Sequence, residues 1–256
     1  MKKSNTIKKV NTKKANTKKT NTKKVNVKKA KETREQKEAR LLKMSMRSNK
    51  INCSNANSKT GVCCNNIQMP NNTCREDAPC KISGKCYCMK GRQQYDKVQQ
   101  AYWRNWRLYN EDSEDFFEQV IYELKHSPLP IMRWFDSGDI PDSDFFDLMV
   151  HVALKLPNIK FMSFTKKYWI VNDYLDNGGK LPDNLNIIFS AWDKTWIVDN
   201  PHNLPVAYVD FKNSILNPDI PKNAYLCPCG YDKTATCSMC QACWNKKLKA
   251  VKFLEH

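Results

Sequence analysis

The residues of this sequence that point most directly to chemistry are its cysteines. There are 12 of them, and every one lies within residues 53–88 or 227–243. No stretch approaches the roughly 18 apolar residues of a membrane helix, and the lysines near the start are not followed by the apolar core of a secretory signal. We therefore expect a cytoplasmic protein without membrane contact. Thiols stay reduced in that compartment, so clustered cysteines favour metal binding over disulfides.

The C-terminal cysteines have the tighter spacing of the two groups. Cys237, Cys240 and Cys243 are each separated by two residues, and either Cys227 or Cys229 can supply a fourth thiolate. Four thiolates suit a tetrahedral zinc ion or an iron–sulfur cluster. Cysteine is also a common buried residue without any ligand, but five cysteines within 17 residues favour ligation. Zinc would make this group a structural centre, and an iron–sulfur cluster would make it a redox centre.

The first group is more widely spaced. Cys74, Cys80 and Cys86 are separated by five residues each, Cys88 follows at once, and three more cysteines lie upstream at 53, 63 and 64. Three thiolates around a loop can hold a four-iron cluster and leave one iron open to a small molecule. The competing interpretation is a zinc site built from Cys80, Cys86, Cys88 and an upstream thiol.

The remaining sequence must supply the elements that position these thiols. Hydrophobic periodicity predicts helices at 94–109, 114–125 (with Ser113 as its N-cap), 142–156 and 167–176. It predicts strands at 131–135, 159–164, 185–190, 206–210, 224–227 and 250–254. Strands that alternate with helices indicate an α/β fold with a mostly parallel sheet. The last connections are too short for full crossover helices, so we expect an open or incomplete (β/α) barrel.

In such folds the site lies beyond the C-terminal ends of the strands. Polar residues follow the predicted strands there, and we take Asp136, Asp139 and Lys166 as candidate catalytic residues. Arg133, Ser137 and Gly138 are candidates to bind the ribose or amino-acid group of a cofactor. The competing interpretation of this segment is a turn at the start of a helix, with Asp139 capping the helix that begins near Pro141.

The net charge of +17 belongs almost entirely to the N-terminal segment. Residues 1–50 hold 19 Lys/Arg and 3 Asp/Glu, which leaves 24 basic and 23 acidic residues in the rest. An Asn-Thr-Lys-Lys repeat with little apolar content predicts a disordered basic tail over 1–50, with a short polar helix within 31–47, before a folded domain at 51–256. Such a tail can bind nucleic acid through phosphate contacts or serve as a solubilising extension.

Eight segments together resemble the phage "gene product 88" family, from about residue 50 to the end. They are SNANSKTG (54–61), TCREDAPC (73–80), CYCMKGR (86–92), RWFDSGDIPD (133–142), KFMSFTKKY (160–168), GKLPDNLNIIFSAW (179–192), PHNLPVAYV (201–209) and the terminal CPCG with CSMCQACW. The family occurs in bacteriophages and in bacteria that carry them, and it has no established biochemical activity.

The resemblance implies two ligand sets. The family pattern has three cysteines that match Cys74, Cys80 and Cys86, and a C-terminal group that matches Cys227, Cys237, Cys240 and Cys243. The first pattern is similar to a variant of the cluster loop of radical S-adenosylmethionine enzymes, which opens a partial α/β barrel, although its spacing differs. This sequence departs from the family at Phe135, where a histidine is usual, and at Cys88, where alanine is usual. A role for that histidine as ligand or proton shuttle would be altered or lost here.

These observations leave three functional hypotheses. The first is a radical-type metalloenzyme that binds an iron–sulfur cluster and reductively cleaves S-adenosylmethionine. The second is a non-enzymatic protein, stapled by zinc, that binds nucleic acid through its tail. The third is a phage accessory factor that binds a host protein.

Overall fold

The structure is a computed structural model that describes residues 32–54 and 64–255. From Arg34 onwards the chain forms one compact unit. The lysine-rich repeat, Cys63 and most of the 54–61 motif lie outside the described residues. No helix in the described ranges is long and apolar enough to cross a membrane.

Eight strands form one sheet in the order β1-β2-β3-β4-β5-β6-β8-β7. Their bounds are Cys53–Ser54, Asn65–Ile67, Ile131–Trp134, Lys160–Thr165, Leu185–Ser190, Val206–Asp210, Tyr225–Leu226 (β7) and Ala250–Leu254 (β8). Among the strand pairs of the described residues, β1–β2 alone is antiparallel. From β2 to β6 the neighbours follow chain order, as in a barrel, whereas a doubly wound sheet reverses order near its centre. The predicted α/β class with an open, mostly parallel sheet is confirmed.

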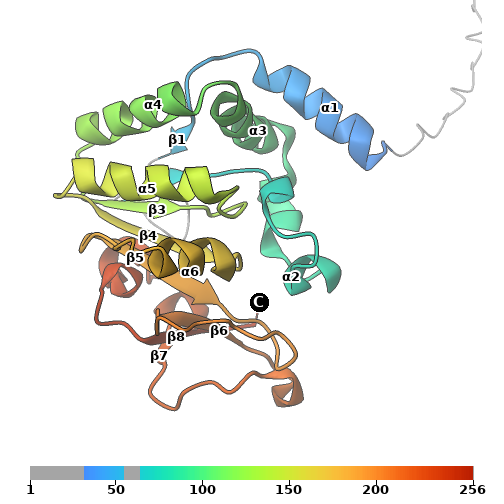
Figure 1. Ribbon diagram of the computed structural model, residues 1–256. Helices are drawn as coiled ribbons and strands as arrows, with labels where there is room; N and C mark the ends of the chain where they lie inside the picture. The colour runs from blue at the N-terminus through green and yellow to red at the C-terminus, as the bar shows by residue number, and fades with distance from the viewer. Residues whose placement is uncertain (1–31, 55–63, 256) are drawn as a thin grey trace, which may run out of the picture. The chain divides into compact units, whose positions relative to one another are not determined.

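Four helices cover one face of this sheet. They are α3 (Asp96–Glu111), α4 (Ser113–His126), α5 (Ser143–Lys155) and α6 (Tyr168–Asp176) (Figure 1). Right-handed crossovers between strands in chain order must place every crossover helix on the same side. The core agrees, because apolar residues of all four helices form one cluster with Trp134, Phe161, Ile187 and Phe189 of the strands.

The opposite face would line the interior of a closed barrel, and here the C-terminal segment covers it. Ile131, Met162, Ile188 and Val251 alternate with the helix-facing residues and form a second cluster with Cys64 and Trp244. Trp244 Nε1 donates to the carbonyl of Met132 at 2.8 Å. The Asn186 amide donates to the carbonyl of Cys243 at 2.8 Å. These bonds fix the cysteine-rich segment against the centre of the sheet.

The compact unit begins earlier than the boundary at 50/51. A helix, α1 (Arg34–Ser45), forms within the predicted range 31–47 and packs on α3. Its one large apolar contact is Leu41, which is 1% exposed. Arg40 also pairs with Asp96 at the start of α3, at 2.8 Å. The polar helix is therefore part of the domain and not of the tail.

The predicted helices and the six predicted strands are all present, with ends within two residues of the expected positions. One prediction of detail was wrong: the N-cap of α4 is Asp112, whose side chain accepts from the Asp115 amide, and not Ser113. The sequence did not predict β1, β2 or the short helix α2 (Pro79–Ile82).

Candidate metal centres

The first cysteine loop, residues 74–88, lies beyond the C-terminal ends of the strands. It follows β2, and its contacts reach the segments after several other strands. Tyr87 donates to the carbonyl of Asp136 after β3. Arg75 donates to the carbonyl of Lys166 after β4, at 3.5 Å. Lys85 pairs with Glu255 after β8, at 2.5 Å. The loop therefore spans the edge at which the site was predicted.

The thiols of this loop share one environment. Cys86 raises the pKa of Cys80, and the pKa of Cys86 in turn depends on Cys80 and Cys88. Burial raises the pKa of Cys74, and Asp139, Cys80 and Cys86 raise it further. The contact with Cys86, followed by burial, raises the pKa of Cys80, while Lys166 acts in the opposite direction. The three cysteines that the sequence singled out therefore lie close enough for Cys80 and Cys86 to raise the pKa of Cys74.

Two of the candidate catalytic residues lie beside these thiols. The carboxylate of Asp139 is buried and accepts from the backbone amides of Ile140 at 2.8 Å and Lys166 at 3.0 Å. Burial raises the pKa of Asp139. The interpretation of Asp139 as a helix cap was wrong, because Asp142 caps α5 by accepting from the Phe145 amide at 2.9 Å. The Lys166 ammonium lies 5.8 Å from the centre of the Trp192 ring.

The third candidate, Asp136, faces a different partner. Its carboxylate oxygen lies 2.9 Å from Nε of Arg133, and both side chains are largely buried. Its carbonyl accepts from the Cys88 thiol at 3.0 Å as well as from Tyr87. Phe135, at the position of the family histidine, has φ 59° and is packed in the apolar core. Asp136 therefore connects the first cysteine loop to Arg133.

Ser137 and Gly138 contact the chain that leads into the first cysteine loop. Ser137 Oγ donates to the side chain of Asn71 at 3.0 Å. Gly138 has φ 83°, and a Cβ there would lie 2.7 Å from the Cβ of Met69. Only glycine combines this φ with so close an approach. The segment after β3 thus docks the loop against the strand end.

The C-terminal cysteine group consists of Cys227, Cys229, Cys237, Cys240 and Cys243. All five line one cavity of about 40 Å³, which Arg133, Phe164 and Trp244 also line. Burial raises the pKa of Cys237 to about 12, and the nearby thiols of Cys229 and Cys227 raise it while Arg133 lowers it. Burial and the neighbouring thiols likewise raise the pKa of Cys243. Both Cys227 and Cys229 reach the cavity, so the structure keeps both as candidates for the fourth thiol that the sequence left open.

The donor chemistry of both groups fits a soft metal. Among the described residues, no three or more His, Cys, Asp and Glu side chains are arranged so that they could hold a metal ion. The C-terminal cavity nevertheless offers five sulfur donors and no carboxylate, which is the set that zinc and iron–sulfur clusters select. Thiols that raise one another's pKa repel as thiolates, and a bound cation removes that repulsion.

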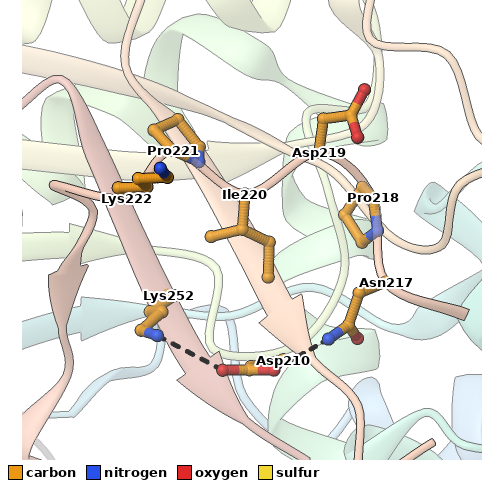
Figure 2. A pocket seen from close by; sticks show the side chains of 8 residues that line it. All are labelled: Asp210, Asn217, Pro218, Asp219, Ile220, Pro221, Lys222 and Lys252. Carbon is orange, nitrogen blue, oxygen red and sulfur yellow. Dashed lines mark hydrogen bonds and ion pairs between the residues drawn. The ribbon is translucent and has the colours of Figure 1, made fainter. Parts of the chain in front are cut away.

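A larger depression lies away from both cysteine groups, and none of the candidate metal ligands lines it. It measures about 560 Å³ and is lined by the eight residues drawn in Figure 2, which include no cysteine or histidine. Asp210 at the end of β6 pairs with Lys252 of β8 at 3.3 Å and accepts from Asn217 at 2.9 Å (Figure 2). The connection from β6 to β7 has no α-helix to cover these strands. We therefore interpret the depression as a consequence of the short connection.

Sequence reasoning missed two features of the sites. The guanidinium of Arg75 lies over the rings of both Trp169 and Trp196, with Cζ 4.9 Å and 4.7 Å from their centres. Arg133 lines the C-terminal cavity. The sequence had instead suggested that Arg133 binds a cofactor at the end of its strand. Its spacing of two residues from Ile131 on a strand was the available signal, since such residues share a face.

Comparison with known proteins identifies the family. The sequence pattern of the family described as "Gene product 88" matches residues 7–246. The match begins within the N-terminal basic segment, well before the motifs quoted above. No curated protein and no solved structure matches the chain. Because the match covers most of its length, this chain belongs to the Gene product 88 family.

Proposed function

We propose that this protein is a cytoplasmic iron–sulfur protein whose first cysteine loop binds a cluster through Cys74, Cys80 and Cys86 and acts on S-adenosylmethionine. The observation that carries the proposal is the place of the loop in the topology. It follows β2, the first of six parallel strands that are neighbours in chain order when the inserted β7 is left aside. A three-cysteine loop after the first strand of a partial barrel is the arrangement that the resemblance implied.

The residues around the loop suit a cluster with three thiolate ligands. When bound, such a cluster would leave one iron open to a small molecule and, once reduced by an external electron donor, would supply the single electron needed for reductive cleavage of S-adenosylmethionine. The contact with Cys86 and burial raise the pKa of Cys80, and burial raises that of Cys74, while Lys166 and Lys81 respectively act in the opposite direction. The two ammonium groups thus offset part of the cost of forming the thiolates that ligation requires.

The spacing of the thiols also favours a cluster over a single ion at this loop. Thiolates around one zinc ion converge on one point, about 2.3 Å from each sulfur, whereas Cys74, Cys80 and Cys86 are separated by five residues each along the loop. Thiolates of a cluster bind different irons and can stand farther apart. The C-terminal cysteine group is then a second metal centre, on the sheet face that would line the interior of a closed barrel.

The test is metal and sulfide analysis of the full chain purified without oxygen. Cys80→Ser should remove the iron and sulfide of one cluster, about four of each, together with cleavage of S-adenosylmethionine. Cys240→Ser should remove the metal of the second centre. Cys53→Ser, a partly buried free cysteine on β1, is the matched control and should change neither. Zinc as the only metal, without sulfide, would refute the proposal.

A second candidate function rests on the distribution of charge. The first 50 residues carry 19 Lys/Arg against 3 Asp/Glu, while the remainder is close to neutral. This favours a nucleic-acid-binding protein in which zinc stabilises the fold and the basic segment supplies the affinity. The truncation described in the Discussion tests this alternative.

A further inference from the structure

Arg133 carries a largely buried positive charge, and the reaction proposed for the first cysteine loop gives it no role. It lies within β3, and its side chain is 15% exposed. The guanidinium lies 5.4 Å from the centre of the Phe164 ring. It forms part of the wall of the cavity that all five thiols of the C-terminal cysteine group line. The side chain therefore points to the sheet face that this group covers.

Two kinds of anionic or potentially anionic group lie near Arg133. Asp136 forms the ion pair at 2.9 Å. The thiols of Cys237 and Cys243 line the same cavity as the Arg133 side chain. A guanidinium that is largely out of water is stable only with anionic neighbours. The Asp136 carboxylate balances the charge of this guanidinium. A thiolate in the cavity would add a further favourable interaction with it.

A metal centre with four thiolate ligands carries such a charge. Four thiolates around a divalent ion leave a net charge of about −2, and this charge would sit in an apolar cavity lined by Phe164, Trp244 and Val251. Burying a net negative charge is costly without a nearby cation. Among the residues that line this cavity, Arg133 is the only one with a cationic side chain.

We propose that Arg133 is the buried counter-charge of the C-terminal cysteine centre, and that Asp136 holds its guanidinium in place. Arg133 is thus a positioning residue that favours metal retention and does not touch the metal. The inference rests on the part of the proposed function that gives the C-terminal cysteines a metal, and it does not depend on the chemistry of the first cysteine loop. It also gives Asp136 a role other than catalysis.

The test compares metal release from the full-length protein as purified. Arg133→Met keeps the length and packing of the side chain but removes the charge, whereas Arg133→Lys keeps the charge without the planar fork. The rate of metal transfer from the C-terminal centre to a chelator should rise on the order of tenfold in Arg133→Met, as for other residues just outside a ligand shell. Arg133→Lys should release metal more slowly than Arg133→Met.

A matched control separates this effect from the loss of any buried arginine. Arg107 on α3 is 6% exposed and donates to the carbonyl of Ser48, and it is not among the residues that line the C-terminal cavity. Arg107→Met should lower thermal stability without speeding metal release. Should Arg133→Met misfold, Arg133→Gln provides a second neutral variant. With an iron–sulfur cluster in the cavity, loss of the charge should also shift its reduction potential to more negative values.

The outcomes distinguish the inference from the proposed function. Equal release rates in wild type, Arg133→Met and Arg133→Lys would refute the role of Arg133 while leaving the metal centre intact. Slow metal release in Arg133→Met together with fast release in Arg133→Lys would also refute the role of Arg133 as a counter-charge, since the positive charge would then not control metal retention. If Cys240→Ser and wild type contain the same metal, the C-terminal centre itself is absent and the proposed function fails on that point.

Discussion

The backbone amide of Lys166 donates to the carboxylate of Asp139 at 3.0 Å, which joins the end of β4 to the turn after β3. The same carboxylate accepts from the Ile140 amide, while the Asp139 amide donates to Thr73 Oγ1 at 3.0 Å, just before the first cysteine loop. Three segments of the site thus meet at one buried residue. Its role in the fold can be tested separately from any role in catalysis.

Replacing Asp139 by alanine should destabilise the fold and loosen the first cysteine loop. The two backbone amides lose their buried acceptor, which costs about 1–3 kcal/mol per unsatisfied group. Asp139→Asn keeps one acceptor oxygen and should lie between alanine and wild type. Urea unfolding measures the stability, and the iron content reports on the loop. Asp144→Ala, an exposed residue of the same region, should change the free energy of unfolding by less than about 0.5 kcal/mol.

The contacts of Arg75 with two tryptophan rings should restrict the mobility of the first cysteine loop more than they stabilise the whole chain. The guanidinium contacts Trp169 and Trp196, and each cation–π contact contributes about 0.5–1 kcal/mol at an exposed site. We expect Arg75→Ala to increase hydrogen exchange across residues 74–88 while the unfolding midpoint changes little. Arg92→Ala removes an exposed arginine just after the loop and should leave the exchange unaltered. Unchanged exchange in Arg75→Ala would show that the loop is held by its other contacts.

The sequence specified the elements with clear apolar patterns and failed where short polar segments depend on distant partners. The strands Leu185–Ser190 and Val206–Asp210 were predicted to the residue, because apolar runs bounded by turn residues identify buried strands. β2 was missed because it is three residues long and begins with two asparagines. The side chain of Asn65 is satisfied by the carbonyls of Leu129 and Ile131, which only the folded chain supplies.

In the candidate site, too, the sequence predicted what local patterns determine and missed what depends on distant partners. Cysteine spacing identified both groups, and the strand ends placed Asp139 and Lys166 near the first one. Sequence reasoning named Asp139 as the cap of the helix that begins near Pro141 and did not consider Asp142, because only the folded chain shows which carboxylate reaches the Phe145 amide. It also gave no reason to expect that Arg133 of β3 would lie beside cysteines that are about a hundred residues later in the chain, because this depends on the packing of the C-terminal segment against the sheet.

Trp244→Phe should detach the C-terminal cysteine segment from the sheet. The indole Nε1 donates to the carbonyl of Met132 in the middle of β3, and Trp244 is 6% exposed. Phenylalanine retains most of the apolar contact but leaves that buried carbonyl without its side-chain partner, at a cost of about 1–3 kcal/mol. We expect a lower unfolding midpoint and faster metal release from the C-terminal centre. Trp169→Phe, at a 44% exposed position, is the control and should leave this centre unaffected.

Removing residues 1–33 should abolish binding to nucleic acid without unfolding the domain. The deletion removes 13 lysines and preserves α1, whose Leu41 is buried against the rest of the compact unit. If the basic segment supplies the affinity, binding of the full chain should fall steeply with salt, and the truncated chain should bind weakly at every salt concentration. Filter binding at several salt concentrations measures both effects.

A longer deletion, of residues 1–49, serves as the contrast. It also removes α1 and should destabilise the domain, as Leu41→Ala alone should by about 2 kcal/mol or more. Affinity that persists in the chain lacking residues 1–33 would instead place the nucleic-acid contacts on the nearly neutral domain. Such a result would mean that the lysines of the N-terminal segment are not the source of binding, because counterion release scales with the number of phosphates that cations neutralise.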